Sequence, residues 1–217
     1  MLVATLFLGL MASAASRAPM ITFGKWVAVE WHTGASEDKP LPLSVRALFV
    51  NGRMRDYTLG EPHVLTDSLF VIRRAYRLND LLPEEKNVAP RWRWQRGGWL
   101  LVNRVTGSVS QLRLPGFDPF HSAASWYRDY VAYCALSDDG QKLSGVVVQL
   151  GRRKPVLKQD LGHARDAVLP DAQCAAPRWQ RQPARVTFEP AGGAALTFEV
   201  RGHAAEPAAA EPEESAE

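Results

Sequence analysis

The stretch Ser125–Leu161 reads SWYRDYVAYCALSDDGQKLSGVVVQLGRRKPVLKQDL and is the most informative about the fold. In order, it holds an aromatic run, an Asp-Asp-Gly turn, an apolar run rich in Val and a basic return run. Val, Tyr and Trp favour strands, whereas Asp and Gly favour tight turns. This stretch therefore predicts antiparallel strands joined by hairpins rather than helices.

Short apolar runs separated by turn residues continue from this stretch in both directions. Asn51–Gly52 follows the run Val45–Val50 and is the strongest short hairpin signal, because both residues tolerate a positive φ angle. Thr106–Gly107 and Ala191–Gly193 separate two further pairs of β-rich runs. The chain is therefore predicted to be all-β and to consist of antiparallel hairpins.

An imperfect internal repeat accompanies these hairpins. Three strand endings match one another, and these are Tyr57–Gly60, Leu112–Gly116 and Gln159–Gly162. Each is followed by a loop that carries a histidine, at His63, His121 and His163. After the first two loops an aspartate precedes another β-rich run, at Asp67 and Asp129. A repeat of this kind indicates similar units that bury their faces against one another.

Through these units the sequence resembles the blade repeats of β-propellers, including propeller-like uncharacterised exported bacterial proteins. Ser125–Leu161 is the most blade-like unit. The resemblance spans about three units, includes no Trp-Asp dipeptide and implies architecture alone. The expected fold is all-β, with antiparallel hairpins in about three to four propeller-like blades. A β-sandwich or a half-open barrel of the same hairpins is the alternative.

The two ends of the chain differ in composition from the part between them. Leu2–Met11 (LVATLFLGLM) is apolar but too short to span a bilayer as a helix, and the small residues of Ala12–Ala15 supply a cleavage site. We therefore interpret residues 1–19 as a signal peptide and short leader. Residues 20–202 are expected to form a single β-rich domain, and residues 203–217 a disordered acidic tail rich in Ala, Pro and Glu.

The predicted export bears on the redox state of the two cysteines, Cys134 and Cys174. In an oxidising compartment, periplasmic or extracellular, they are expected to form a disulfide. On the loop-entropy model such a bond stabilises the fold by ~3–4 kcal/mol. Two cysteines are too few for a structural zinc site, and the chain has no Cys-x-x-Cys motif.

The charge of the chain is unevenly distributed. The net charge is +3, although the predicted tail alone carries five Glu and no Lys or Arg. The remainder is therefore more basic, which we attribute to solubility alone, with a preference for acidic partners as the alternative explanation. Because the chain is predicted to be exported, a protein or glycan of the cell envelope is the expected partner and nucleic acid is not. No membrane-spanning segment is expected after processing.

Chemically versatile side chains cluster most densely in the loop Gly116–Arg128, GFDPFHSAASWYR. Aromatic rings beside a carboxylate, an imidazole and a guanidinium are typical of ligand sites and interface hot spots. We predict that the residues that contact the partner are Asp118, Phe120, His121, Trp126, Tyr127 and Arg128. The structural alternative is that the rings fill space between hairpins and that Asp118 caps a turn.

A second unusual segment is Arg91–Arg96, RWRWQR, which places two arginines on one strand face and both tryptophans on the other. We interpret it as a strand whose tryptophans enter the core while its arginines face water, rather than as a cationic binding strip. In a propeller His63, His121 and His163 would share one face. Their spacing forms no recognisable ligand motif, so neither a metal nor another cofactor is expected.

The chain lacks the sequence motifs of common enzymes. It contains no Gly-x-Ser-x-Gly, His-Glu-x-x-His, Walker or Gly-x-Gly-x-x-Gly motif. Asp118 and Asp129 would suit glycoside hydrolysis as a carboxylate pair, but Asp129 matches Asp67 in the repeat, which indicates a structural position. The favoured function is an exported, non-catalytic binding or scaffolding module of the cell envelope that uses loop 116–128. The alternative is an envelope hydrolase that uses Asp118 and His121.

Overall fold

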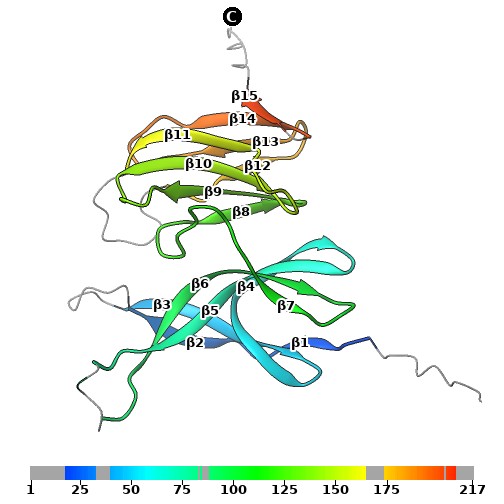
Figure 1. Cartoon of the computed structure of the whole chain (residues 1–217), viewed down its shortest axis with the longest axis vertical. Coiled ribbons are helices and arrows are strands. Elements are labelled where there is room, and N and C mark those ends of the chain that lie inside the picture. The colour runs from blue at the N-terminus through cyan, green and yellow to red at the C-terminus, as the bar shows by residue number, and fades with distance from the viewer. Residues whose placement is uncertain are drawn as a thin grey trace, which may run out of the picture.

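The computed structural model of the chain describes residues 18–32, 40–82, 84, 88–164, 174–202 and 204–208. Within these residues every regular element is a β-strand, so the all-β prediction is confirmed. Figure 1 shows two halves stacked along the longest axis, with β1–β7 in the lower half and β8–β15 in the upper half. In this described part of the chain, no helix is long and apolar enough to cross a membrane.

The lower half is one seven-stranded sheet. Its strands are β1 (Ile21–Phe23), β2 (Val27–Trp31), β3 (Leu41–Val50), β4 (Arg53–Thr66), β5 (Leu69–Asn79), β6 (Trp92–Asn103) and β7 (Val109–Leu112). Consecutive strands from β3 to β7 pair as antiparallel hairpins, and β3 also pairs with β1 and β2. A parallel pairing of Trp31 with Trp94 links β2 to β6, so the strand pairings run in a ring.

Each face of this sheet buries its own apolar cluster, because side chains alternate along a strand. One cluster consists of Leu48, Phe70, Ile72, Leu100 and Val102. The other consists of Val45, Leu59 and Ala75, with Val29, Leu43, Tyr57 and Trp94 packed against them. The lower half therefore has apolar residues on both sides of the same strands.

The two tryptophans of Arg91–Arg96 lie in different environments. Trp94 packs edge-on against Tyr57, with ring centroids 4.8 Å apart, whereas 56% of the Trp92 surface is exposed. The expectation that both enter the core is therefore wrong for Trp92. Trp92 begins β6 opposite Asn79, the last residue of β5, so it lies at the end of the sheet beyond both clusters.

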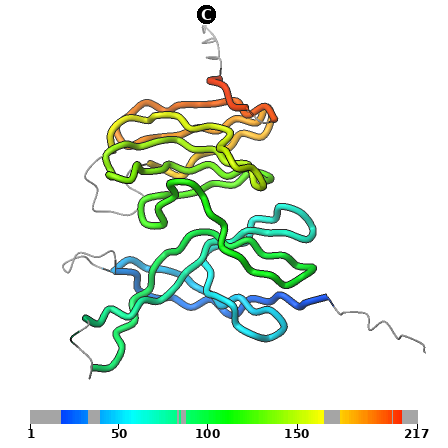
Figure 2. Tube along the Cα trace, in the orientation of Figure 1, coloured from blue at the N-terminus to red at the C-terminus, as the bar shows by residue number. Residues whose placement is uncertain are grey.

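The upper half contains two four-stranded antiparallel sheets, each with its strands in chain order. The first comprises β8 (Ala124–Tyr127), β9 (Tyr130–Leu136), β10 (Lys142–Gln149) and β11 (Leu157–His163). The second comprises β12 (Arg178–Gln180), β13 (Arg185–Phe188), β14 (Leu196–Arg201) and β15 (Ala204–Pro207). Figure 2 shows both as meanders of the chain. The blade-like stretch 125–161 thus falls in the first sheet.

The two upper sheets pack face to face through one shared apolar cluster. This cluster consists of Ala132, Cys134, Leu143 and Val147 from the first sheet and Val186, Phe188, Phe198 and Val200 from the second, with Cys174. The opposite face of β9 and β10 is also buried, in part by Phe117 and Trp126. Burial on both faces explains why β9 is an unbroken apolar run rather than an alternating one.

The predicted disulfide is present between Cys134 and Cys174, which are 40 residues apart in sequence. It connects β9 to the segment that precedes β12. Cys174 also forms an isolated bridge with Pro190, just beyond β13. The bond therefore links the two packed sheets, and it is compatible with an oxidising compartment.

The predicted hairpin turns are confirmed, but the predicted three to four blades are not. Asn51 and Gly52, both at positive φ, connect β3 to β4. The first unit of the repeat lies within the seven-stranded sheet instead of forming its own blade. Gly60 does not follow a strand end: at φ 63° it lies inside β4, where the pairing with β5 shifts register. A glycine at positive φ lets the strand bend there without ending.

The two predicted end segments are described only in part. Residues 1–17 of the predicted signal peptide and leader lie outside the described residues, as do residues 209–217 of the predicted tail. The predicted tail nevertheless contains β15, Ala204–Pro207, which pairs with β14. Backbone hydrogen bonds form this pairing, so it needs no large apolar side chain, and the second upper sheet extends past residue 202.

Candidate functional site

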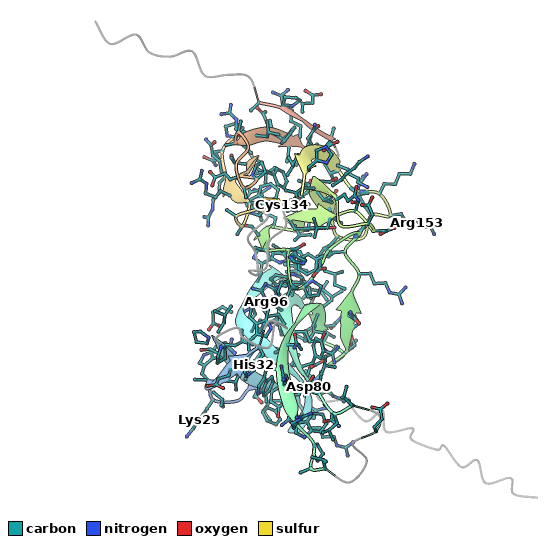
Figure 3. All side chains as sticks on the ribbon, turned by 90° about the vertical axis from the view of Figure 1, so that its left-hand side faces the viewer. Lys25, His32, Asp80, Arg96, Cys134 and Arg153 are labelled. Carbon is teal, nitrogen blue, oxygen red and sulfur yellow. A yellow bond between two sulfur atoms is a disulfide. The ribbon has the colours of Figure 1, made fainter. Side chains whose placement is uncertain are left out.

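The loop between β7 and β8 connects the two halves and contacts both. In the lower half, Arg73 and Arg96 each donate from Nη2 to a loop carbonyl, of Pro119 and Phe120 respectively, at 2.7 Å. The Phe120 ring packs edge-on against Trp31, with centroids 5.7 Å apart. Figure 3 shows Arg96 at the end of the lower half that faces the upper half. The loop is therefore held by the lower half.

Asp118 acts as a turn cap within this loop. Its Oδ1 accepts hydrogen bonds from the backbone N–H groups of Phe120 (2.7 Å) and His121 (3.3 Å). The buried Ser122 hydroxyl donates to the carbonyl of Cys134 at 2.6 Å and accepts from the Asp118 N–H at 3.2 Å. These bonds join the loop to β9 and give Asp118 the structural role that short side chains often have at turns.

Tyr133 of β9 holds the start of the same loop. Its hydroxyl donates to the Pro115 carbonyl at 2.8 Å, and the Phe117 ring packs edge-on against its ring. Burial raises the pKa of Tyr133 well above its usual range, so the hydroxyl stays protonated and remains a donor. Residues 115–122 therefore pack between the halves.

Trp126 on β8 contacts the lower half directly. Its ring packs edge-on against Trp99 (centroids 5.2 Å apart) and is stacked on His63 at 5.6 Å. His63 Nε2 lies 2.7 Å from the carbonyl oxygen of Arg128. Because a carbonyl only accepts, this bond assigns the proton to Nε2. His63 thus positions both the indole and the backbone of the β8–β9 turn.

Arg128 has an unusual backbone conformation in this turn. Arg128 and Asp129 form a two-residue loop between Tyr127 and Tyr130, and Arg128 has a φ of 52°. For residues other than glycine the left-handed region costs roughly 1–2 kcal/mol, so glycine would suit this position better. The exposed Arg128 guanidinium lies 5.3 Å from the Tyr127 ring centroid. Asp129 instead accepts a bond from Gln149 at 2.8 Å.

Trp179 and Arg181, from β12 and the turn after it, complete the same surface. The Tyr127 hydroxyl donates to the Arg181 carbonyl at 3.3 Å, and the Tyr127 and Trp179 ring centroids are 5.5 Å apart. Trp179 Nε1 donates to the Ser125 carbonyl at 3.1 Å.

The Tyr130 ring also packs near Trp179, at a centroid distance of 6.3 Å. Burial, and then the Asp129 carboxylate, raise the pKa of Tyr130, against the opposing effect of Arg152 and Arg128. The hydroxyl stays protonated and donates to the Gly202 carbonyl at 2.5 Å. Trp179 is therefore held in place by both aromatic neighbours.

These contacts create an open groove of about 680 Å³, hereafter the junction groove. Its lining residues are His63, Val64, Leu65, Ser125, Trp126, Tyr127, Arg128, Trp179, Arg181 and Gln182. Three segments far apart in the sequence supply three aromatic rings, two arginines and a histidine, and none of the lining residues is an Asp or a Glu. The groove can therefore present flat apolar faces and hydrogen-bond donors to one occupant.

Two other hollows are chemically simpler. One, of about 460 Å³, lies over β9–β11 and is lined by Pro115, Gly116, Ala135, Leu136, Ser137, Asp138, Lys142, Ser144, Val146, Pro155 and Lys158. The other, of about 360 Å³, lies in the lower half and is lined by Gly24, Lys25, Val27, Val45, Arg46, Ala47, Phe49, Tyr57 and Trp94. Neither combines several aromatic rings with two exposed arginines, so the junction groove is the stronger candidate.

The structure divides the six predicted contact residues into two groups. Trp126, Tyr127 and Arg128 line the junction groove, whereas the other three, Asp118, Phe120 and His121, lie in the loop between the halves. Trp179, Arg181 and Gln182 also line the groove, although they were not among the predicted contact residues. One available signal was the tetrapeptide Arg-Trp-Gln-Arg, which occurs at residues 93–96 and again at 178–181.

The three histidines of the repeat do not come together. His63 contacts Arg128, the His121 ring packs against Phe120, and His163 pairs with Lys142 at the end of β10. Among the described residues, no three His, Cys, Asp or Glu side chains are grouped so that they could hold a metal ion. No protein-family model, curated protein or solved structure matches the chain. Its function is therefore inferred from the groove itself.

Proposed function

We propose that this protein is an exported, non-catalytic binding module of the cell envelope and that the junction groove is its glycan-binding site. The observation that carries the proposal is the gathering of Trp126, Tyr127 and Trp179 with basic side chains in one open groove. Aromatic rings offer flat apolar faces at low entropic cost, and a few placed polar groups set orientation.

The disulfide and the apolar start of the chain support export. Cys134 and Cys174 are bonded and buried, which fits an oxidising compartment. Leu2–Met11 followed by small residues has the pattern of a signal peptide. Together they support a binding event in the periplasm or outside the cell.

The environment of Asp118 favours binding over hydrolysis. Glycoside cleavage ordinarily needs two carboxyl groups on either side of the scissile bond. Oδ1 of Asp118 is engaged by two backbone N–H groups of its own turn, and no Asp or Glu lines the junction groove. The hydrolase alternative, with Asp118 and His121, therefore has no carboxylate pair at the proposed site.

For the architecture, we infer a β-sandwich of two blade-like meanders in the upper half, joined to the seven-stranded sheet by the 115–122 segment. The shared cluster of β9, β10, β13 and β14 supports the sandwich. Arg73 and Arg96, which hold the connecting loop, support a fixed arrangement of the two halves and thus a preformed groove.

The test is calorimetric titration of the mature protein with soluble fragments of bacterial cell-wall and capsular polysaccharides. We expect saturable binding by the wild type and a loss of ~10-fold or more in affinity in Tyr127→Ala, because this ring lines the groove and packs on Trp179. Trp92→Ala is the matched control: it removes an exposed aromatic ring from the lower half and should leave affinity unchanged.

Three results would contradict this function. They are no saturable binding to any fragment, equal affinities of Tyr127→Ala and the wild type, and cleavage of a fragment that disappears in Asp118→Asn. The last result would establish the hydrolase alternative. Circular dichroism of each variant verifies that the fold is retained.

A further inference from the structure

We infer that the junction groove takes an anionic glycan, one whose sugar units carry carboxylate, sulfate or phosphate groups. This inference rests on the proposed function and names the chemical class of its ligand. The main support for this ligand class is the positive charge of the groove lining. Arg128, Arg181 and His63 line the groove, and no lining residue is acidic.

The two groove arginines differ in their partners from the arginines of the chain that form ion pairs. Arg46, Arg74 and Arg93 each form an ion pair with a carboxylate, at 2.8, 2.8 and 2.7 Å. Among the described residues no carboxylate lies within ion-pair distance of Arg128 or Arg181, and both arginines are exposed. Their guanidinium groups are thus available to an external anion.

The backbone at Arg128 provides a second, independent observation. An arginine at a φ of 52° in a two-residue hairpin loop is less favourable than a glycine. Strained residues of this kind concentrate at binding sites, where the side chain has a use that offsets the strain. Here the His63 bond to the Arg128 carbonyl fixes the turn, and the exposed guanidinium lies at the groove beside Tyr127.

The chemistry of guanidinium suits this ligand class. Its planar fork donates two parallel hydrogen bonds to a carboxylate, sulfate or phosphate, with geometric specificity that an ammonium lacks. Trp126, Tyr127 and Trp179 supply the faces on which sugar rings pack, while the arginines select the charged substituents. A neutral glycan could pack its sugar rings on the aromatic side chains, but it would offer no anionic group to the two arginines.

The experiment uses two matched pairs of hexasaccharides. The first pair is hexagalacturonate and its methyl ester, and the second is a heparin hexasaccharide and its desulfated, N-acetylated and carboxyl-reduced form, so that the second member of each pair carries no charge. Each is titrated into the mature protein by calorimetry at low salt and at 0.5 M NaCl, a concentration that screens charge. We expect at least one anionic member to bind ~10-fold or more tightly than its uncharged partner, and high salt to shrink the difference.

Arg128→Gly is the decisive variant, because glycine suits the positive φ of the turn, so the side chain and its guanidinium are removed without strain on the backbone. It should unfold at the same temperature as the wild type or higher, yet lose ~10-fold in affinity for the anionic member and little for the neutral one. Arg153→Gly is the matched control, since it removes the same charge from the exposed turn between β10 and β11, as Figure 3 shows. It should leave the affinity unchanged.

The outcomes separate this inference from the proposed function. Equal binding of the charged and uncharged members would overturn the anionic class while leaving a glycan-binding groove. No binding of any member would overturn the anionic class, and no binding of the cell-wall and capsular fragments either would overturn both. If Arg128→Gly and Arg153→Gly lost the same affinity for the anionic hexasaccharide, the ligand would be attracted to the overall positive charge of the protein. This result would also overturn the inference.

Discussion

Reducing the Cys134–Cys174 bond is expected to lower the free energy of unfolding by ~4 kcal/mol, close to the whole stability of a small domain. The bond spans 40 residues and links β9 to the segment before β12, so it restricts a large loop of the unfolded chain. It also holds the two upper sheets against each other through residues that are 3% and 2% exposed. Reduction should therefore unfold the upper half well before the lower half.

Urea unfolding measures this effect, followed by circular dichroism with and without reductant. The double variant Cys134→Ala/Cys174→Ala is the control, because it lacks the bond and should not respond to reductant. If the wild type has the same midpoint under both conditions, the bond contributes nothing to stability and this expectation is wrong.

Phe188→Ala is expected to cost ~3–5 kcal/mol, the range for deleting a large aromatic ring from a packed core. Phe188 is fully buried between the two upper sheets and lies directly over Gly145 of β10. A Cβ added at Gly145 would lie 3.2 Å from the Phe188 ring, so the ring occupies the space that a side chain would fill. The pair therefore sets how closely the two sheets approach.

A double-mutant cycle on this pair, measured by urea unfolding, gives the sharper test. Gly145→Ala should destabilise the wild type but be tolerated in the Phe188→Ala background, where the methyl group has room. Phe188→Leu, which preserves most of the volume, should cost less than Phe188→Ala. Additive effects of the two alanine substitutions would show that the ring and the glycine are not in contact.

Local features of the fold were predictable because they depend on neighbouring residues. Asn51–Gly52 predicted its hairpin through the φ angles that both residues tolerate. The run in β9 predicted a strand, and its unbroken apolar pattern reflects burial on both faces. The disulfide followed from the compartment that the start of the chain indicates.

The arrangement of strands into sheets was not predictable in the same way. Gly60 and Gly116 both follow a Leu that ends a β-rich run, with Pro115 inserted in the second case, yet Gly60 bends a long strand whereas Gly116 lies in a loop turn. The difference arises because β4 pairs with β5 on both sides of Gly60, and such long-range pairing leaves no local sequence signal. A repeat of strand endings therefore did not imply a repeat of blades.

Half of the predicted contact residues line the groove. The sequence could indicate only those groove residues that are adjacent to one another in the chain. Trp126, Tyr127 and Arg128 were recognisable as a cluster because they are adjacent in sequence. Their groove neighbours His63 and Trp179 come from other sheets, so only the folded chain brings them together. The strain at Arg128, which marks the groove most clearly, is a backbone property that no sequence motif carries.

Binding of an anionic glycan in the junction groove should be visible in the indole N–H signals of a ¹⁵N NMR titration. The chain has seven tryptophans, which cover the groove and both halves. On addition of the tighter-binding anionic hexasaccharide, the signals of Trp126 and Trp179 should shift in a saturable way while that of Trp92 stays in place. Shifts confined to Trp92, with Trp126 and Trp179 unmoved, would contradict the account.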